Sequence, residues 1–174
     1  NSSIGAFAVV VGGGGSQPNE MNTASGNYSL VGGGTNNRAR GSYSVVVGGG
    51  GTILDSNAAT GNFSFIGSGA ANVVKANYSS SLGGYKNIVS ANYGIISGGA
   101  YNTVNNTLGT ISGGGYNNVS GDNSTVGGGA YNTIIGTSSI IAGGANNHIQ
   151  GLFSVISGGG GISASDSNSI ISDL

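Results

Sequence analysis

Residues 121–135 read GDNSTVGGGAYNTII, and residues 136–150 repeat the pattern as GTSSIIAGGANNHIQ. The fifteen residues before them, 106–120, read NTLGTISGGGYNNVS. Each unit carries a turn residue, a Ser, an apolar residue, a Gly pair, an Asn and a second apolar residue before the next turn. A fixed period of this kind indicates a repeat architecture, in which every unit buries its apolar face against its neighbours.

We number each unit from 1 to 15, with Gly121 at position 1. Two insertions, residues 16–21 (SQPNEM) and 52–56 (TILDS), interrupt the period at the same point, between positions 11 and 12. Loops of this kind are tolerated at the corner of a solenoid. We therefore expect one repeat domain, residues 1–174, cut from a longer fibre. Units begin at Gly5, Gly26, Gly41, Gly61, Ala76, Ala91, Asn106, Gly121, Gly136 and Gly151, with a partial unit at Asp166.

Each unit should contain two short strands, at positions 4–7 and 12–15, joined by turns. The Gly pairs fit tight corners, whereas a Gly pair in every unit and β-branched apolar residues oppose a helix. Period-two alternation places positions 4, 6, 12 and 14 inside. The Asn residues at position 12 then form a ladder along the interior. The sequence thus predicts an all-β solenoid with 15-residue coils.

Position 5 should face outward, yet most coils place an apolar residue there. Such a row would run the length of the rod and expose apolar surface on a monomer. Association of several copies along a common axis would bury it, and closed symmetry is the usual arrangement. The candidate interface residues are Val9, Leu30, Val45, Phe65, Ile95, Ile140, Val155 and Ile170.

Composition excludes several classes of function. The chain has 38 Gly, no Cys and only 5% charged residues, with a net charge of −1. Disulfides and thiolate metal sites are therefore excluded, and no basic surplus is available to bind nucleic acid. No apolar run is long enough for a membrane span. His148 is the only His and has no nearby carboxylate, so we expect no enzymatic activity, no metal and no cofactor.

The pattern S-x-I-x-G-G-x-x-N-x-V-x-G resembles the YadA-like head repeat of trimeric autotransporter adhesins. The resemblance covers nearly the whole chain outside the insertions. It implies a left-handed parallel β-roll, three parallel chains side by side, and an extracellular fibre anchored at the outer membrane of a cell. The period of fifteen is one residue longer than the commonest period of that family, and its neck and stalk are absent. Trimeric phage or virus fibres built from similar repeats would place the segment on a virion instead.

Two features are candidates for receptor binding. The insertions contain Pro18, Glu20 and Asp55, and loops on rigid scaffolds often carry recognition. The alternative is that the insertions are neutral, or that they pack on a neighbouring chain through Ile53 and Leu54. The second feature is a column of tyrosines at position 11, Tyr101, Tyr116 and Tyr131, which follows an aromatic column at position 3. These columns suit stacking ladders that hold the corners, and also a sugar- or protein-binding surface.

The sequence therefore predicts a non-enzymatic, homotrimeric fibre segment that attaches to a host-surface glycan or an extracellular-matrix protein. A purely structural spacer, with recognition in other domains, is the main alternative. An ice-binding solenoid would need a regular outward Thr array, which Asn118 interrupts between Thr103 and Thr133. A sugar-cleaving tailspike would need paired carboxylates. Asp122 and Asp166 stand three coils apart, roughly 14 Å, too far for such a pair.

Overall fold

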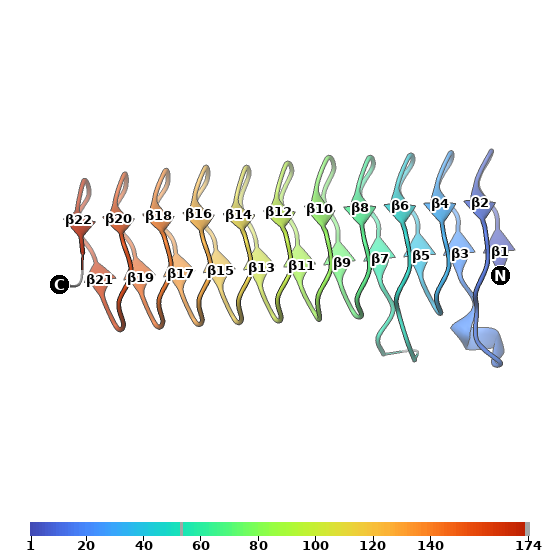
Figure 1. Ribbon diagram of the computed structural model, residues 1–174. Helices are drawn as coiled ribbons and strands as arrows, with labels where there is room; N and C mark the ends of the chain where they lie inside the picture. Colours follow the sequence, from blue (N-terminus) through green and yellow to red (C-terminus); the bar gives the residue numbers. More distant parts are fainter. Residues whose placement is uncertain (53, 173–174) are drawn as a thin grey trace.

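The computed structural model describes residues 1–52 and 54–172, and it forms a single column of stacked coils (Figure 1). Each coil contributes one short strand to each of two parallel sheets, and each sheet has eleven strands. Neighbouring strands in a sheet are therefore always one coil apart in the chain. The predicted all-β solenoid with 15-residue coils is confirmed.

The odd-numbered strands form one sheet and occupy positions 13–14 of the repeat. They are β1 (Ser2–Ser3), β3 (Thr23–Ala24), β5 (Arg38–Ala39), β7 (Ala58–Ala59), β9 (Val73–Val74), β11 (Ile88–Val89), β13 (Thr103–Val104), β15 (Asn118–Val119), β17 (Thr133–Ile134), β19 (His148–Ile149) and β21 (Ser163–Ala164).

The even-numbered strands form the second sheet and occupy positions 5–6. They are β2 (Val9–Val10), β4 (Leu30–Val31), β6 (Val45–Val46), β8 (Phe65–Ile66), β10 (Ser80–Ser81), β12 (Ile95–Ile96), β14 (Thr110–Ile111), β16 (Thr125–Val126), β18 (Ile140–Ile141), β20 (Val155–Ile156) and β22 (Ile170–Ile171). A short 3-10 helix, η1 (Pro18–Glu20), lies in the first insertion.

The insertions leave the strand register intact. Ile95 pairs with Thr110 one regular coil later, whereas Val9 pairs with Leu30 and Val45 pairs with Phe65 across the two insertions. Both loops leave the corner between positions 7 and 12, which is the lower edge of the rod in Figure 1. A loop at a corner adds chain without changing which residues stack, so the column continues through it.

Two apolar side chains per coil fill the interior. Positions 6 and 14 supply them, as Val126 and Ile134 do in one coil, and both are fully buried. Ser124 and Asn132 from positions 4 and 12 are buried beside them. The predicted inward positions are therefore confirmed. Because each coil buries only two apolar side chains, buried polar groups must also be well bonded for the fold to be stable.

The asparagine ladder meets that requirement by bonding to the backbone of two coils. The Oδ1 atom of Asn117 accepts a hydrogen bond from the backbone N–H of Asn132 in the next coil, at 3.0 Å. Its Nδ2 donates to the carbonyl oxygens of Gly113 and Gly129, at 3.1 and 3.0 Å. The column also includes Asn22, Asn37 and Asn57 of the first three coils, which are buried.

The two outer faces of the rod differ in charge. The odd-strand face, formed by outward residues at positions 13 and 15, carries Arg38, Arg40, Lys75 and His148. The even-strand face, formed by positions 5 and 7, carries no charged residue among the coils that the structure describes, and positions 5 and 7 hold mainly apolar or small residues. The rod is therefore two-sided, with an uncharged apolar face opposite a polar face.

Candidate interaction surfaces

The candidate functional residues belong to the surface of the rod. Across residues 1–52 and 54–172 the structure has no pocket. Nor does that part of the chain bring together three or more His, Cys, Asp or Glu side chains as a metal site would require. It also contains no helix with the length and apolar character of a membrane span. Candidate residues must therefore be sought on the faces, corners and loops of the rod.

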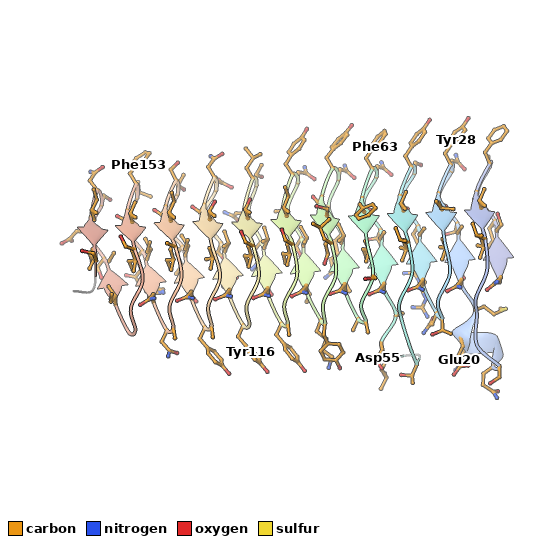
Figure 2. The ribbon with its side chains drawn as sticks, in the orientation of Figure 1. Glu20, Tyr28, Asp55, Phe63, Tyr116 and Phe153 are labelled. Carbon is orange, nitrogen blue, oxygen red and sulfur yellow. The ribbon has the colours of Figure 1, made fainter. Side chains whose placement is uncertain are left out.

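The corner at position 3 carries a continuous aromatic ladder in the first six coils. Neighbouring ring centroids are 4.9–5.3 Å apart and their planes lie within 13° of parallel. Figure 2 shows these rings projecting from the upper edge, with Tyr28 and Phe63 labelled. Because each inner ring is covered on both faces by its neighbours, only ring edges and hydroxyl groups face solvent. The ladder is Phe7, Tyr28, Tyr43, Phe63, Tyr78 and Tyr93.

A shorter ladder stands on the opposite corner, at position 11. Tyr101 stacks on Tyr116 at 4.7 Å, and Tyr116 stacks on Tyr131 at 4.8 Å. Tyr85 meets Tyr101 edge-on, at 5.5 Å, and so ends the ladder on that side. The ammonium group of Lys86 lies 5.1 Å from the Tyr85 ring centroid and 5.5 Å from that of Tyr101. A hydrogen bond to Tyr85 and attraction to Tyr101 raise the pKa of Lys86. Lys86 is therefore a cation held between two rings.

Both ladders depend on an unusual backbone conformation. The non-glycine residues at positions 3 and 11 have φ values between 53° and 62°, in the left-handed region that favours glycine. This conformation turns the amide toward the preceding coil: the N–H of Tyr43 donates to Asn27 O, and that of Tyr101 donates to Tyr85 O. The corner is thus bonded axially, and each side chain projects away from the rod.

The insertions lie on the position-11 corner and are joined through Asn36. In the first loop, the carbonyl of Glu20 accepts from the N–H of Asn36 at 2.9 Å. In the second, the carbonyl of Thr52 accepts from Asn36 Nδ2 at 3.0 Å. Asn36 is buried between them, and its Oδ1 has no partner. The two loops therefore form one connected surface over the first three coils, although they are far apart in sequence.

The carboxylates of these loops bond within their own loops. Glu20 Oε2 accepts from the N–H of Gln17 at 3.3 Å, and Asp55 Oδ2 accepts from the Thr52 hydroxyl at 3.1 Å. Leu54 at the tip of the second loop is 83% exposed. Ile53 lies outside the described residues, and Pro18 is placed only as the first residue of η1.

The proposed receptor-binding residues do not converge on one spot. Pro18, Glu20 and Asp55 belong to the first and third coils, whereas Tyr101, Tyr116 and Tyr131 belong to the sixth to eighth. They share the lower edge of the rod, where Figure 2 labels Glu20, Asp55 and Tyr116. The loops and the position-11 ladder are therefore two separate surfaces on one corner.

The structure places the candidate interface row along the even-strand face. Val9, Ile95, Ile140 and Ile170 are each at least 40% exposed in a single chain. Leu30, Val45, Phe65 and Val155 are half-buried by the strands on either side. Position 7 adds the exposed side chains Val11, Val47 and Leu82 to the same face. Sequence reasoning missed these three because position 7 is glycine, alanine or serine in most other coils.

No protein-family model and no curated protein matches the chain.

Proposed function

We propose that this segment is a rigid rod of a homotrimeric surface fibre, with left-handed coils and three parallel copies, that attaches its bearer to a host surface. The observation that carries the proposal is the uncharged apolar face of the even-numbered strands, which a single chain leaves in water. Three copies facing a common axis bury that face and leave the polar odd-strand face outside. Ten coils at about 4.8 Å each give a rod about 50 Å long.

Attachment is the proposed role of the surfaces that depart from the repeat. The loops bearing Pro18, Glu20 and Asp55, together with Tyr101, Tyr116 and Tyr131, are the candidates for binding a glycan or an extracellular-matrix protein. Three copies of each surface on one rod multiply a weak contact through avidity. The proposed mechanism needs no catalysis and no cofactor. It places the rod outside the cell, on a cell surface or on a virion.

The second candidate is a spacer that carries recognition domains elsewhere. Two observations favour it: the described residues form no pocket, and the inner rings of both ladders have their faces covered by other rings. A sugar that stacks on an aromatic ring needs an open ring face. A spacer needs only stiffness, which axial hydrogen bonds supply in every coil.

The test combines sedimentation with binding to arrays of glycans and matrix proteins. The proposal expects a trimer that binds at least one array component. Deleting residues 16–21 and 52–56 and changing Tyr101, Tyr116 and Tyr131 to Ser should abolish that binding, while Ile135→Ser on the odd-strand face serves as the control. A trimer that binds nothing favours the spacer. A monomer at micromolar concentration contradicts the assembly itself.

A further inference from the structure

The two aromatic ladders divide the first eight coils of the rod between them. At position 3, aromatic residues fill the first six coils, and Leu108, Asn123 and Ser138 follow in coils seven to nine. At position 11, the tyrosines occupy coils six to eight, and Ala71 and Lys86 precede them in coils four and five. One corner therefore becomes aromatic where the other stops, and they overlap only in the sixth coil, at Tyr93 and Tyr101.

These aromatic residues occupy a backbone conformation that disfavours them. Ten of the twelve Phe and Tyr residues have φ values between 53° and 59°. A left-handed conformation costs a residue with a side chain roughly 1–2 kcal/mol, and Asn or Gly adopts it more easily. The chain does use Asn146 and Gly161 at the same corner in later coils. Ala71, Leu108 and Ser138 hold the same conformation through the same axial N–H bonds, so the corner itself fixes the backbone, and ring contacts offset its cost where the residue is aromatic.

Stacking within one chain accounts for only part of that offset. Tyr78 and Tyr116 as whole residues remain 53% and 48% exposed although each ring has a stacked neighbour on both sides. Their outward edges are apolar surface that no residue of the same chain covers. Since an aromatic side chain contributes most when its ring is desolvated, this exposed portion is suited to a partner.

The proposed assembly determines which surface of a partner reaches these edges. The position-3 and position-11 corners flank the even-strand face on its two sides (Figure 2). When equivalent copies turn this face toward a common rotation axis parallel to the rods, the position-3 corner of each copy lies beside the position-11 corner of the next. Rotation about such an axis causes no axial shift, so each coil lies beside the same coil of its neighbour.

We propose that these two corners form one shared aromatic seam between neighbouring copies, filled by the position-3 ladder of one chain along coils one to six and by the position-11 ladder of the other along coils six to eight. Exposed Leu54 and Met21 on the insertion loops extend the seam over the neighbouring ladder at its N-terminal end. This inference rests on the proposed trimer. It adds a contact between chains to the attachment role proposed for Tyr101, Tyr116 and Tyr131, and it leaves the carboxylates of Glu20 and Asp55 outside the seam.

Cysteine cross-linking of the full chain tests the seam, because the chain has no natural Cys. In the ninth coil both corners carry small residues, so Ser138→Cys and Asn146→Cys are combined in one variant. The two positions lie on opposite corners of a single chain, which limits cross-linking within it. A short bis-maleimide reagent is added, and covalent species are separated on a denaturing gel. The control combines Ser138→Cys with Ala71→Cys, whose coils are five apart, about 24 Å along the rod.

If the seam exists, the matched pair gives covalent trimers. The control pair and both single-cysteine variants give none. The seam also predicts that Tyr116→Ala weakens trimer assembly at least tenfold in sedimentation, whereas Thr133→Ala on the odd-strand face does not. The seam is refuted if the protein sediments as a trimer but the matched pair does not cross-link, or if the control pair cross-links equally well. Either result is still consistent with the proposed trimer. A monomer overturns both.

Discussion

Buried asparagine has a role at the residue scale that an apolar side chain of similar size cannot fill. Asn117 satisfies two glycine carbonyls and one backbone N–H, all in or near the tight position-11 corner. The corner needs these bonds because its glycines turn the backbone away from the sheet ladder. The predicted ladder of amides is thus mainly a ladder of side chain to backbone bonds.

Asn117→Ala is expected to lower the free energy of unfolding by about 1–4 kcal/mol, because it removes the partners of the buried Asn132 N–H and of the Gly113 carbonyl, whereas the Gly129 carbonyl keeps its bond from Gly115 N–H. Urea unfolding followed by circular dichroism measures the loss. Asn118→Ala is the matched control, since Asn118 is the next residue but points outward, and its loss should stay within about 0.5 kcal/mol. Equal losses for the two variants would contradict the assigned role of the ladder.

The two glycines of a corner pair differ in how much space surrounds them. Gly99 has φ of +85°, and a Cβ atom there would lie 2.0 Å from the carbonyl oxygen of Gly114 in the next coil. A Cβ atom on Gly98 would meet nothing within 4 Å. Only the second glycine of this pair is therefore required by the close approach of neighbouring coils.

Gly99→Ala should destabilise the fold by at least about 2 kcal/mol through backbone strain and the contact with Gly114. Gly98→Ala should change stability by less than about 1 kcal/mol. Thermal unfolding of the two variants under identical conditions provides the comparison. A Gly99 variant as stable as the Gly98 variant would show that the corner can relax away from the contact.

At the element scale, the stacked rings of the two aromatic ladders link each coil to the next at the corners, outside the two sheets. Tyr116 has a stacked ring on each side, whereas Tyr131 at the end of its ladder has one. The column of Val and Ile at position 6 performs the same coupling inside the rod. Its one polar member, Ser81, is fully buried between the rungs of Ile66 and Ile96.

Tyr116→Ser removes two stacking contacts and should cost about 1–3 kcal/mol, at about 0.5–1.5 kcal/mol for each ring pair. Tyr131→Ser removes one contact and should cost about half as much. The comparison uses unfolding free energies at one fixed protein concentration, because the proposed assembly would contribute to both values. A loss at Tyr131 equal to or larger than that at Tyr116 would argue against stacking as the source of stability.

At the scale of the whole molecule, the uncharged even-strand face is the proposed site of assembly. Ile95 and Ile140 lie on this face and are 40% and 44% exposed in one chain. Ile135 has a similar exposure, 51%, but belongs to position 15 on the polar face. The three isoleucines are therefore matched in size and exposure and differ in the face that they occupy.

Changing Ile95 and Ile140 together to Asp should dissociate or unfold the assembly, because the charges would be buried without partners at the proposed interface. Ile135→Asp should leave the assembly intact. Sedimentation velocity and circular dichroism separate dissociation from unfolding. A stable trimer carrying both Asp substitutions would refute the interface on the even-strand face.

The sequence by itself determined the solenoid, the coil length, the inward positions and the corner that bears the insertions. It could do so because stacking in register makes every coil repeat the same burial, so the period shows directly which residues share a column. The Asn column at position 12 was predictable for the same reason.

Only the tertiary structure decided how the corners are built and what they present. The left-handed conformation of residues such as Tyr116 opposes their local preference, so no propensity could reveal it. Asn36 joins two loops that are distant in sequence, and no repeat position encodes that contact. The separation of the loops from the position-11 ladder was likewise visible only in the folded chain. A periodic pattern specifies what every coil shares, whereas departures from it acquire neighbours only when the chain is folded.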